Sequence, residues 1–177
     1  MRELVAPMET TRILDIGGGG GSATGFFVGG SLCVTLIEPD SRKVRLGSRR
    51  HPLIRFVRAR GESLPFVDGA FERVTAVVSL HHASDVNRVV EEMYRVLSPD
   101  GRLVIHELYP GDLPGWISRI LARRLHGSLP TFLAPEALRR LLESRTFVVD
   151  AVRDGARGYF VAATRPGMPH GRAGSEI

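Results

Sequence analysis

The sequence is poor in cysteine, in lysine and in long apolar runs. Its single cysteine, Cys33, excludes an intramolecular disulfide and a metal centre built from cysteines, which favours a reducing, intracellular setting. No stretch approaches the roughly 20 apolar residues that a membrane-spanning helix needs, and the first twelve residues contain no apolar segment typical of a signal peptide. We therefore expect a cytoplasmic protein without a transmembrane segment.

The positive charge comes almost entirely from arginine, because Lys43 is the only lysine among 24 basic residues. The net charge is +5, which favours an anionic partner such as RNA or a membrane surface. However, the arginines are spread along the chain and do not form one basic block. We interpret them as a generally solvated basic surface, so nucleic-acid binding is not favoured.

Short β-branched or apolar runs alternate with segments of helical periodicity, which indicates an α/β domain with a mainly parallel sheet. The chain has 177 residues and suits a single domain, 1–165, with a flexible tail at 166–177. A helical insertion is expected at 113–144, and a turn at Ser98-Pro99-Asp100-Gly101. The expected strands are residues 12–16, 32–38, 54–58, 71–80, 102–108, 147–152 and 159–164, and the expected helices are residues 22–28, 41–50, 85–97 and about ten residues from Pro135.

Five consecutive glycines, Gly17 to Gly21, follow the first strand and precede a helix. This arrangement brings backbone close to a nucleotide and directs helix N–H groups at it. The run contains no lysine followed by serine or threonine, which excludes a P-loop. Gly18, Gly20 and Ala23 satisfy the dinucleotide pattern G-x-G-x-x-A, so the glycines by themselves leave the kind of nucleotide open.

Two acidic residues narrow this choice. Glu38 ends the second strand about 20 residues beyond the glycines, where a carboxylate can accept both hydrogen bonds of a ribose diol. Asp15 lies two residues before Gly17, where it would repel the phosphates of a dinucleotide. The resulting D-x-G-x-G-x-G resembles motif I of the class I S-adenosylmethionine-dependent methyltransferases. The resemblance implies that Asp15 helps to place the cofactor's ammonium group, directly or through water.

Two further segments carry the same resemblance. GESLPFVDGAFERV is similar to the family's loop between the third and fourth strands, and EEMYRVLSPDGRLVIHE to its next helix, turn and fifth strand. Together the matches cover residues 12–107 and look most like the small methyltransferases of ubiquinone and menaquinone biosynthesis. The resemblance implies a Rossmann-like, doubly wound, seven-stranded sheet with helices on both faces, and S-adenosylmethionine as the cofactor.

The resemblance also implies a set of cofactor-binding residues and no metal ligand. Family members often carry an aspartate for the adenine amino group where Arg60 stands here. Glu62, or the backbone of Gly61 and Ser63, is the expected substitute. The predicted cofactor-binding residues are Asp15, Gly17, Gly18, Gly19, Gly21, Glu38, Pro39, Gly61, Glu62, Ser63, Leu64, Ser79 and Leu80.

The candidate catalytic residues are histidines. Methyl transfer depends chiefly on alignment, and a general base is needed only when the acceptor must lose a proton. His82 and His81 follow the fourth strand at the carboxyl edge of the sheet and are the candidate bases; the alternative is that they pack around the adenosine or face solvent. His106, Glu107 and Tyr109 form a second set, in which strand alternation points His106 and Glu107 to opposite faces.

Three functions remain open. The first is methyl transfer to a small, apolar or aromatic acceptor; the second is methylation of RNA or protein; the third is a non-catalytic nucleotide-binding partner with the same fold. The first strand begins about a dozen residues into the chain, which leaves no room for an N-terminal lid. The candidates for closing the site are the apolar stripe of 113–126, a partner subunit, or a second copy in a homodimer.

Overall fold

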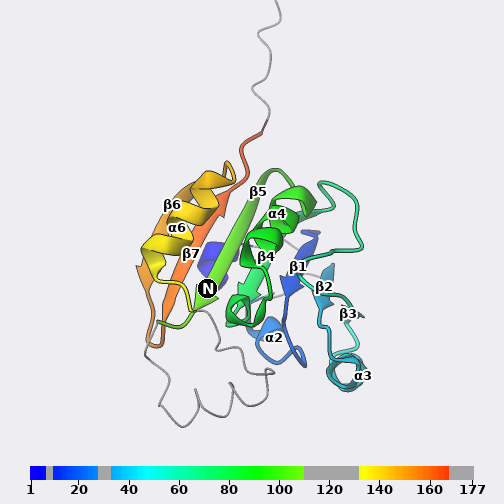
Figure 1. Ribbon diagram of the computed structural model, residues 1–177. Helices are drawn as coiled ribbons and strands as arrows, with labels where there is room; N and C mark the ends of the chain where they lie inside the picture. The colour runs from blue at the N-terminus through cyan, green and yellow to red at the C-terminus, as the bar shows by residue number, and fades with distance from the viewer. Residues whose placement is uncertain (7–9, 28–32, 110–131, 168–177) are drawn as a thin grey trace, which may run out of the picture.

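One seven-stranded sheet organises the part of the chain that the computed structural model describes, residues 1–6, 10–27, 33–109 and 132–167 (Figure 1). The strand order is β3-β2-β1-β4-β5-β7-β6. Strands β1 to β5 run parallel, and β7 is antiparallel to both β5 and β6. This arrangement confirms the predicted Rossmann-like, mainly parallel α/β fold. The strands are β1 (Ile13–Ile16), β2 (Val34–Ile37), β3 (Ile54–Val57), β4 (Phe71–Val77), β5 (Leu97–Glu107), β6 (Val148–Asp154) and β7 (Tyr159–Thr164).

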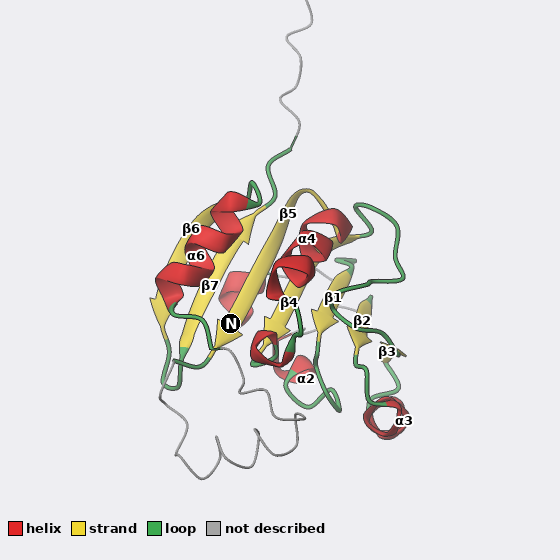
Figure 2. Cartoon of the chain, in the orientation of Figure 1, coloured by secondary structure: helices red, strands yellow, loops and turns green. Residues whose placement is uncertain are grey.

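Helices lie on both faces of the sheet. Figure 2 shows α4 and α6 in front of it, while the short α1 lies behind β5, with which it is in contact. The sheet is therefore doubly wound, as predicted. The helices are α1 (Arg2–Val5), α2 (Thr24–Phe27), α3 (Ser41–Arg50), α4 (Val86–Val96) and α6 (Pro135–Ser144), and a 3-10 turn, η1 (Leu80–His82), follows β4.

Short-range capping signals set the helix starts. The Asp40 side chain accepts a hydrogen bond from the Arg42 backbone N–H at 2.8 Å and begins α3 at the predicted residue. Asp85 caps α4 in the same way through the Arg88 N–H. Each such cap contributes about 1 kcal/mol to stability. The predicted helix from Pro135 is also present, with proline in its first turn.

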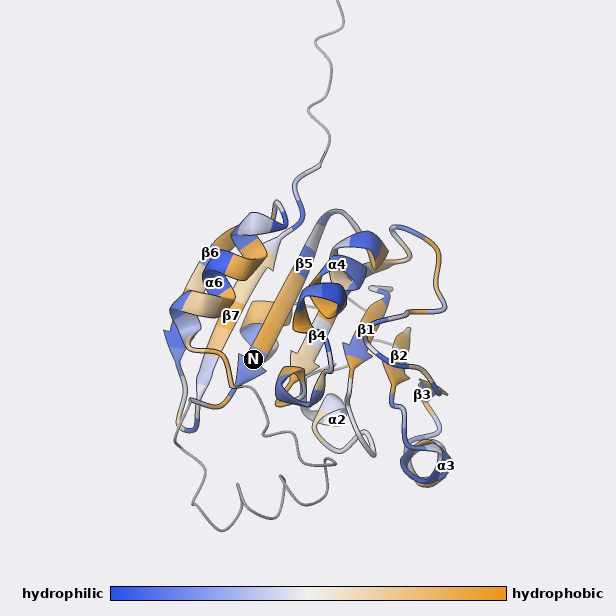
Figure 3. Cartoon of the chain, viewed as in Figure 1, coloured by the Kyte–Doolittle hydropathy of each residue, from blue (hydrophilic) through white to orange (hydrophobic). Residues whose placement is uncertain are grey.

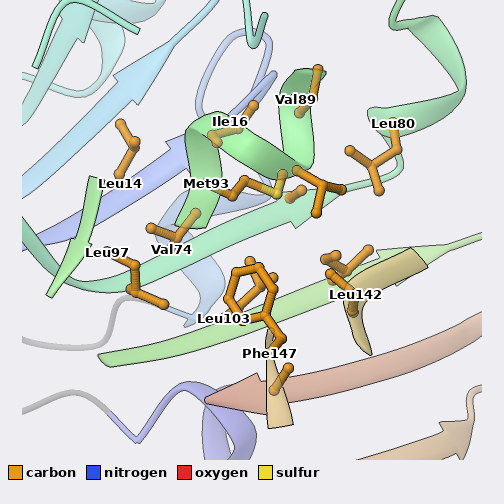
Figure 4. Packing of buried hydrophobic residues seen from close by; sticks show 14 of the residues in the cluster. Leu14, Ile16, Val74, Leu80, Val89, Met93, Leu97, Leu103, Leu142 and Phe147 are labelled. Atoms are coloured by element: carbon orange, nitrogen blue, oxygen red, sulfur yellow. The ribbon is translucent and has the colours of Figure 1, made fainter. Parts of the chain in front are cut away.

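The main hydrophobic core lies between the sheet and the helices α4 and α6. The predicted apolar stripe of α4 is buried, with Val89, Val90 and Met93 at 2% exposure or less. Figure 4 shows Val89 and Met93 among side chains of β1, β4 and β5. Leu4 and Val5 of α1 cover a smaller cluster on the opposite face. In Figure 3 the central strands are mainly hydrophobic, whereas α3 at the edge is mainly hydrophilic.

Some predicted boundaries were wrong. Strand β4 ends at Val77, because Val78 adopts a φ of +49° and η1 begins two residues later. Strand β5 begins at Leu97 instead of residue 102, and the predicted turn at 98–101 is an irregularity inside it. At this irregularity the pairing register between β5 and β4 shifts, and Asp100 has a φ of +59°. Helix α1 was not predicted.

Part of the sequence prediction concerns residues outside the described ranges. The helical stripe at 113–126 and the end of the chain from residue 168 fall there. Within the ranges that are described, no helix combines the length and the apolar character needed to cross a membrane.

Candidate functional site

A cavity of about 530 Å³ opens at the carboxyl ends of β1, β2 and β4. This volume is ordinary for a small-molecule site. The chain turns from β1 to β2 on one side while β4 lies on the other, and open α/β sheets bind their ligands at such a switch point. Its walls are Ile16, Gly17, Ile37, Glu38, Pro39, Lys43, Arg60, Gly61, Glu62, Val78, Ser79, Leu80, His82, Ala83 and Val89.

The glycine loop meets the cavity through Gly17. A Cβ on Gly17 would lie 2.7 Å from the Ser79 Cβ, and one on Gly18 would lie 2.4 Å from an Asp15 carboxylate oxygen. A Cβ on Gly19 would meet no atom within 4 Å, whereas one on Gly21 would meet the Phe56 ring at 2.9 Å. Of the predicted glycines, Gly18, Gly19 and Gly21 do not line the cavity. They shape the turn that places Gly17 there.

Asp15 lies beneath the glycine loop and does not line the cavity. Its carboxyl group is fully buried and accepts hydrogen bonds from the hydroxyls of Thr24, at 2.5 Å, and Thr75, at 2.8 Å. Burial raises the pKa of Asp15 to about 6, and the two hydrogen bonds oppose this effect. Asp15 thus joins the start of α2 to β4 below the glycines.

Glu38 occupies the place that the sequence predicts for a ribose contact. The residue is buried at the end of β2 and lines the cavity. Its Oε1 accepts a hydrogen bond from the Asp40 backbone N–H at 3.1 Å and lies 3.7 Å from the Lys43 ammonium. Both interactions engage the same oxygen, so Glu38 retains acceptor capacity at Oε2.

The loop after β3 forms another wall through Arg60, Gly61 and Glu62. Glu62 Oε1 accepts hydrogen bonds from both the backbone N–H and the hydroxyl of Ser84, each at 2.8 Å. Burial opposes ionisation of Glu62, but these hydrogen bonds outweigh it and lower its pKa. Arg60 is exposed, and its side chain forms no hydrogen bond or ion pair with any described residue.

The predicted residues Ser63 and Leu64 do not line the cavity. Leu64 belongs to the hydrophobic core, and its backbone N–H donates to Glu92 at 2.7 Å. The Ser63 N–H closes a turn with the Arg60 carbonyl oxygen at 3.2 Å. Both residues therefore support the wall that Arg60 and Gly61 present.

Glu107 organises the histidine turn. Its Oε1 accepts hydrogen bonds from the Ser79 and Leu80 backbone N–H groups at 2.8 Å, and its Oε2 lies 2.9 Å from His81 Nδ1. The side chains of His81 and Glu107 are 4% and 3% exposed, so this pair is closed to solvent. His81 is not a wall residue of the cavity. Glu107 therefore holds η1 from beneath.

His82 is the candidate histidine that lines the cavity. Partial desolvation and the neighbouring His81 lower the pKa of His82 to about 4, although part of the side chain stays exposed. His106 lies on the opposite face of β5, where its ring stacks on Phe160 at 4.4 Å. The predicted opposite orientation of His106 and Glu107 is confirmed.

Several wall residues were missed by the sequence analysis. They are apolar residues at strand ends and on α4, together with one cation: Ile16, Ile37, Val78, Ala83, Val89 and Lys43. The apolar ones look like core residues in the sequence, and only the packing of α4 against β1 shows that they border a cavity. Lys43 was recognisable as a cation in the first turn of the predicted helix that follows Glu38.

The comparisons with known proteins agree with this geometry. A family model described as a methyltransferase domain matches residues 14–105. A demethylmenaquinone methyltransferase from Beutenbergia cavernae is 32% identical over 155 residues, which are 86% of this chain and 62% of that protein. Among eight such curated relatives, the chain spans between 42% and 62% of the relative's length.

Solved structures show the same fold. The YcgJ protein from Bacillus subtilis superposes with a TM-score of 0.77 and 18% identity, over 95% of this chain and 97% of that one. The [4+2]-cyclase SpnF superposes with a TM-score of 0.76 and 22% identity, over 94% of this chain and 79% of that one. The fold is therefore shared with proteins of different reported chemistry, and function has to be argued from the site.

Proposed function

Because the chain belongs to the class I S-adenosylmethionine-dependent methyltransferase family, we propose that it transfers a methyl group from S-adenosylmethionine to a small, apolar or aromatic acceptor. The observation that carries the proposal is the cavity at the switch point, where Gly17 and the buried Glu38 meet. Both residues lie inside the matched range 14–105. An RNA or protein methyltransferase would share the cofactor site and differ in the acceptor, whereas a non-catalytic partner would bind the nucleotide without turnover.

The cavity walls fit a nucleoside. Glu38 keeps an oxygen available for a ribose hydroxyl. The apolar side chains of Ile37, Leu80 and Val89 suit the faces of a purine ring. Gly17 has a φ of +72° and packs against Ser79, where a side chain would collide, so glycine keeps the backbone in this position at the cavity wall. These features support S-adenosylmethionine as the ligand.

Arg60 is the wall residue that fits this cofactor least well. A guanidinium only donates hydrogen bonds, and the adenine amino group is also a donor. The two groups therefore cannot pair, whereas a guanidinium can stack on an aromatic ring. Glu62, whose Oε1 accepts from Ser84, is the carboxylate of this loop that lines the cavity and is the proposed acceptor for the amino group. The Gly61 backbone remains the other candidate.

The residues around the cavity chiefly supply alignment. When bound, S-adenosylmethionine supplies a methyl group already activated by its sulfonium. Orientation of two reactants is worth about 7 to 11 kcal/mol in favourable cases. Here Glu38 and Gly17 would hold the nucleoside, while Glu107 fixes η1 and with it the position of His82. With a pKa near 4, His82 is neutral at pH 7 and can accept a proton or a hydrogen bond.

The names of the curated relatives support the proposed class of methyl acceptor. Those proteins are named demethylmenaquinone and ubiquinone/menaquinone methyltransferases. A quinone-type acceptor has an aromatic ring and is apolar, which agrees with the acceptor expected from the sequence. Methylation at a ring carbon releases a proton, and His82 is the proposed group to receive it.

Calorimetry of cofactor binding tests the first part of the proposal. We expect S-adenosylmethionine and its demethylated product, S-adenosylhomocysteine, to bind, and NAD not to bind. Glu38→Gln should weaken S-adenosylhomocysteine binding roughly tenfold, because a charge-assisted hydrogen bond is worth about 1.5–3 kcal/mol. The exposed Glu136→Gln on α6 is the matched control and should bind like the wild type. Preference for NAD would contradict the proposed cofactor.

Turnover of a demethylmenaquinone analogue tests the second part. If His82 acts as a base, His82→Ala should reduce turnover roughly 10²-fold. Its affinity for S-adenosylhomocysteine should fall much less. His106→Ala is the control, because His106 lies on the other face of the sheet. Equal losses of turnover and affinity in His82→Ala would show that this histidine only shapes the cofactor pocket.

A further inference from the structure

Helix α3 carries five cations and no acidic residue. Arg42, Arg45 and Arg49 recur at spacings of three and four and therefore share one stripe of the helix. Arg42 approaches Asp40 at 3.6 Å, whereas no described carboxylate pairs with Arg45 or Arg49. All five cations are exposed, which leaves the outer surface of α3 with a strong positive charge: Arg42, Lys43, Arg45, Arg49 and Arg50.

The edge strand β3 extends this positive surface. Among the described strands it pairs only with β2, and α3 packs beside it at the rim of the sheet (Figure 1). Residues 42–60 contain no aspartate or glutamate. We call the exposed cations of this segment the basic edge; it consists of Arg42, Lys43, Arg45, Arg49, Arg50, Arg55, Arg58 and Arg60. It therefore concentrates one third of the chain's 24 basic residues.

Two apolar side chains project from the same segment. Leu46 on α3 is 48% exposed, and Leu53 in the turn before β3 is 75% exposed. The structure also exposes Val67, Val148 and Val152, but Leu46 and Leu53 lie among eight cations in a segment without acidic residues. Leucines in such surroundings are typical of a helix that lies on a bilayer, where cations meet anionic headgroups and apolar side chains enter the interface.

A nucleic acid is the other polyanion to consider. Sequence-tolerant binding of single strands uses exposed aromatic rings on which bases stack. The aromatic residue of this segment, Phe56, is instead half-buried and packs close to Gly21 and Gly47. We propose that the basic edge, with Leu46 and Leu53, docks the protein on the surface of an anionic lipid bilayer.

The basic edge also borders the cavity. Lys43 and Arg60 belong to both. Docking through this surface would bring the mouth of the cavity next to the lipid headgroups. An apolar acceptor dissolved in the bilayer would then have a short path to the site. This last step rests on the proposed function, but the docking itself does not, and binding can be measured without any acceptor or cofactor.

Vesicle flotation with the full chain tests the proposal. We expect the protein to float with vesicles of phosphatidylcholine mixed with phosphatidylglycerol and to stay behind with phosphatidylcholine alone. High salt should weaken the binding, because it screens exposed charges. Leu46→Ser/Leu53→Ser should lower the fraction that remains bound at high salt, since that fraction depends on apolar contact.

Charge reversal locates the surface. Arg45→Glu/Arg49→Glu should weaken binding to the phosphatidylglycerol vesicles at least about tenfold. Arg153→Glu/Arg157→Glu changes the net charge equally at exposed positions of β6 and the following turn, and should bind like the wild type. Equal loss in both double variants would overturn the proposal, because net charge alone would explain it. So would a failure to float, or tRNA binding through Arg45 and Arg49 without vesicle binding.

Discussion

Asp15 shows how burial and charge conflict at a single residue. Its carboxyl group is fully buried between the hydroxyls of Thr24 and Thr75. Because the pKa rises to about 6 from 3.8, the folded state holds a proton on Asp15 more tightly than the unfolded chain does. Protonated Asp15 therefore contributes fully to the stability of the folded state below pH 4, and this contribution is lost as the pH rises through 6. The pKa difference corresponds to roughly 3 kcal/mol.

Asp15→Asn should abolish this pH dependence. We expect the variant to be more stable than the wild type at pH 8, by up to roughly 3 kcal/mol, and to lose that advantage at pH 4. Urea unfolding at both pH values measures the difference. Asp85→Asn is the control, since Asp85 is exposed and asparagine also serves as an N-cap. A stability difference that does not change with pH would contradict the buried, protonated Asp15.

Arg60 lies at the part of the proposed cofactor site that would hold the adenine ring. Arg60→Asp would replace a donor with an acceptor for the adenine amino group, and we expect S-adenosylhomocysteine to bind about tenfold more tightly. The variant should also discriminate against the inosine analogue, whose 6-oxo group is an acceptor, more strongly than the wild type does. Calorimetry with both ligands measures this. Arg55→Asp, at an exposed position away from the cavity walls, should change neither affinity.

At the scale of elements, helix α4 fastens the loop between β3 and β4. Arg95 donates to the carbonyl oxygens of Leu64 at 3.0 Å and Phe66 at 2.7 Å, and to Asp68 at 2.8 Å. Glu92 is hydrogen-bonded to both Arg95 and the Leu64 N–H. The Leu-Pro-Phe segment that marks the family in the sequence thus anchors the loop, while Arg60, Gly61 and Glu62 nearby reach the cavity.

Arg95→Lys should loosen this loop. A lysine keeps the charge but cannot reproduce the fork of hydrogen bonds, so we expect a loss of roughly 1–3 kcal/mol in unfolding free energy. Hydrogen exchange should accelerate at the Leu64 and Gly69 amides, which bond to Glu92 and to the Arg95 carbonyl oxygen. Arg139→Lys is the control, because the Arg139–Glu143 ion pair on α6 is exposed, and it should have little effect. Unchanged exchange in Arg95→Lys would refute the anchoring role.

At the scale of the whole molecule, the cavity draws its walls from the ends of β1 and β2, from residues just beyond β3 and β4, and from α4. A ligand that fills it contacts segments far apart in the sequence, so its binding should stabilise the domain as a unit. The stabilisation follows from mass action, because the unfolded chain has no such cavity.

Thermal denaturation with ligands measures this coupling. S-adenosylhomocysteine at about one hundred times its dissociation constant should add about 2.7 kcal/mol to the unfolding free energy, a rise of roughly 5–10 °C in Tm for a domain of this size. NAD at the same concentration should cause no shift, and Glu38→Gln should need a higher ligand concentration for the same effect. A shift with NAD equal to that with S-adenosylhomocysteine would contradict the proposed cofactor.

The sequence alone determined what depends on neighbours along the chain. The caps Asp40 and Asp85, the buried stripe of α4 and the strand that ends at the glycines follow from short-range hydrogen bonding and from the periods of helix and strand. These local rules placed Glu38, Gly17 and His82 at one sheet edge, and the cavity is there. The family resemblance added the cofactor, which periodicity could not indicate.

Only the tertiary structure decided which of these residues reach the cavity. Asp15 and Leu64 were predicted to bind the cofactor, but packing buries one beneath the glycines and the other in the core. Glu107 meets His81 across 26 residues. The basic edge is visible in the sequence as the segment 42–60 without acidic residues, but only the fold shows that its cations are exposed and that α3 packs beside β3 at the rim of the sheet. Such contacts depend on how the sheet brings distant segments together, and no local pattern of residues encodes that distance.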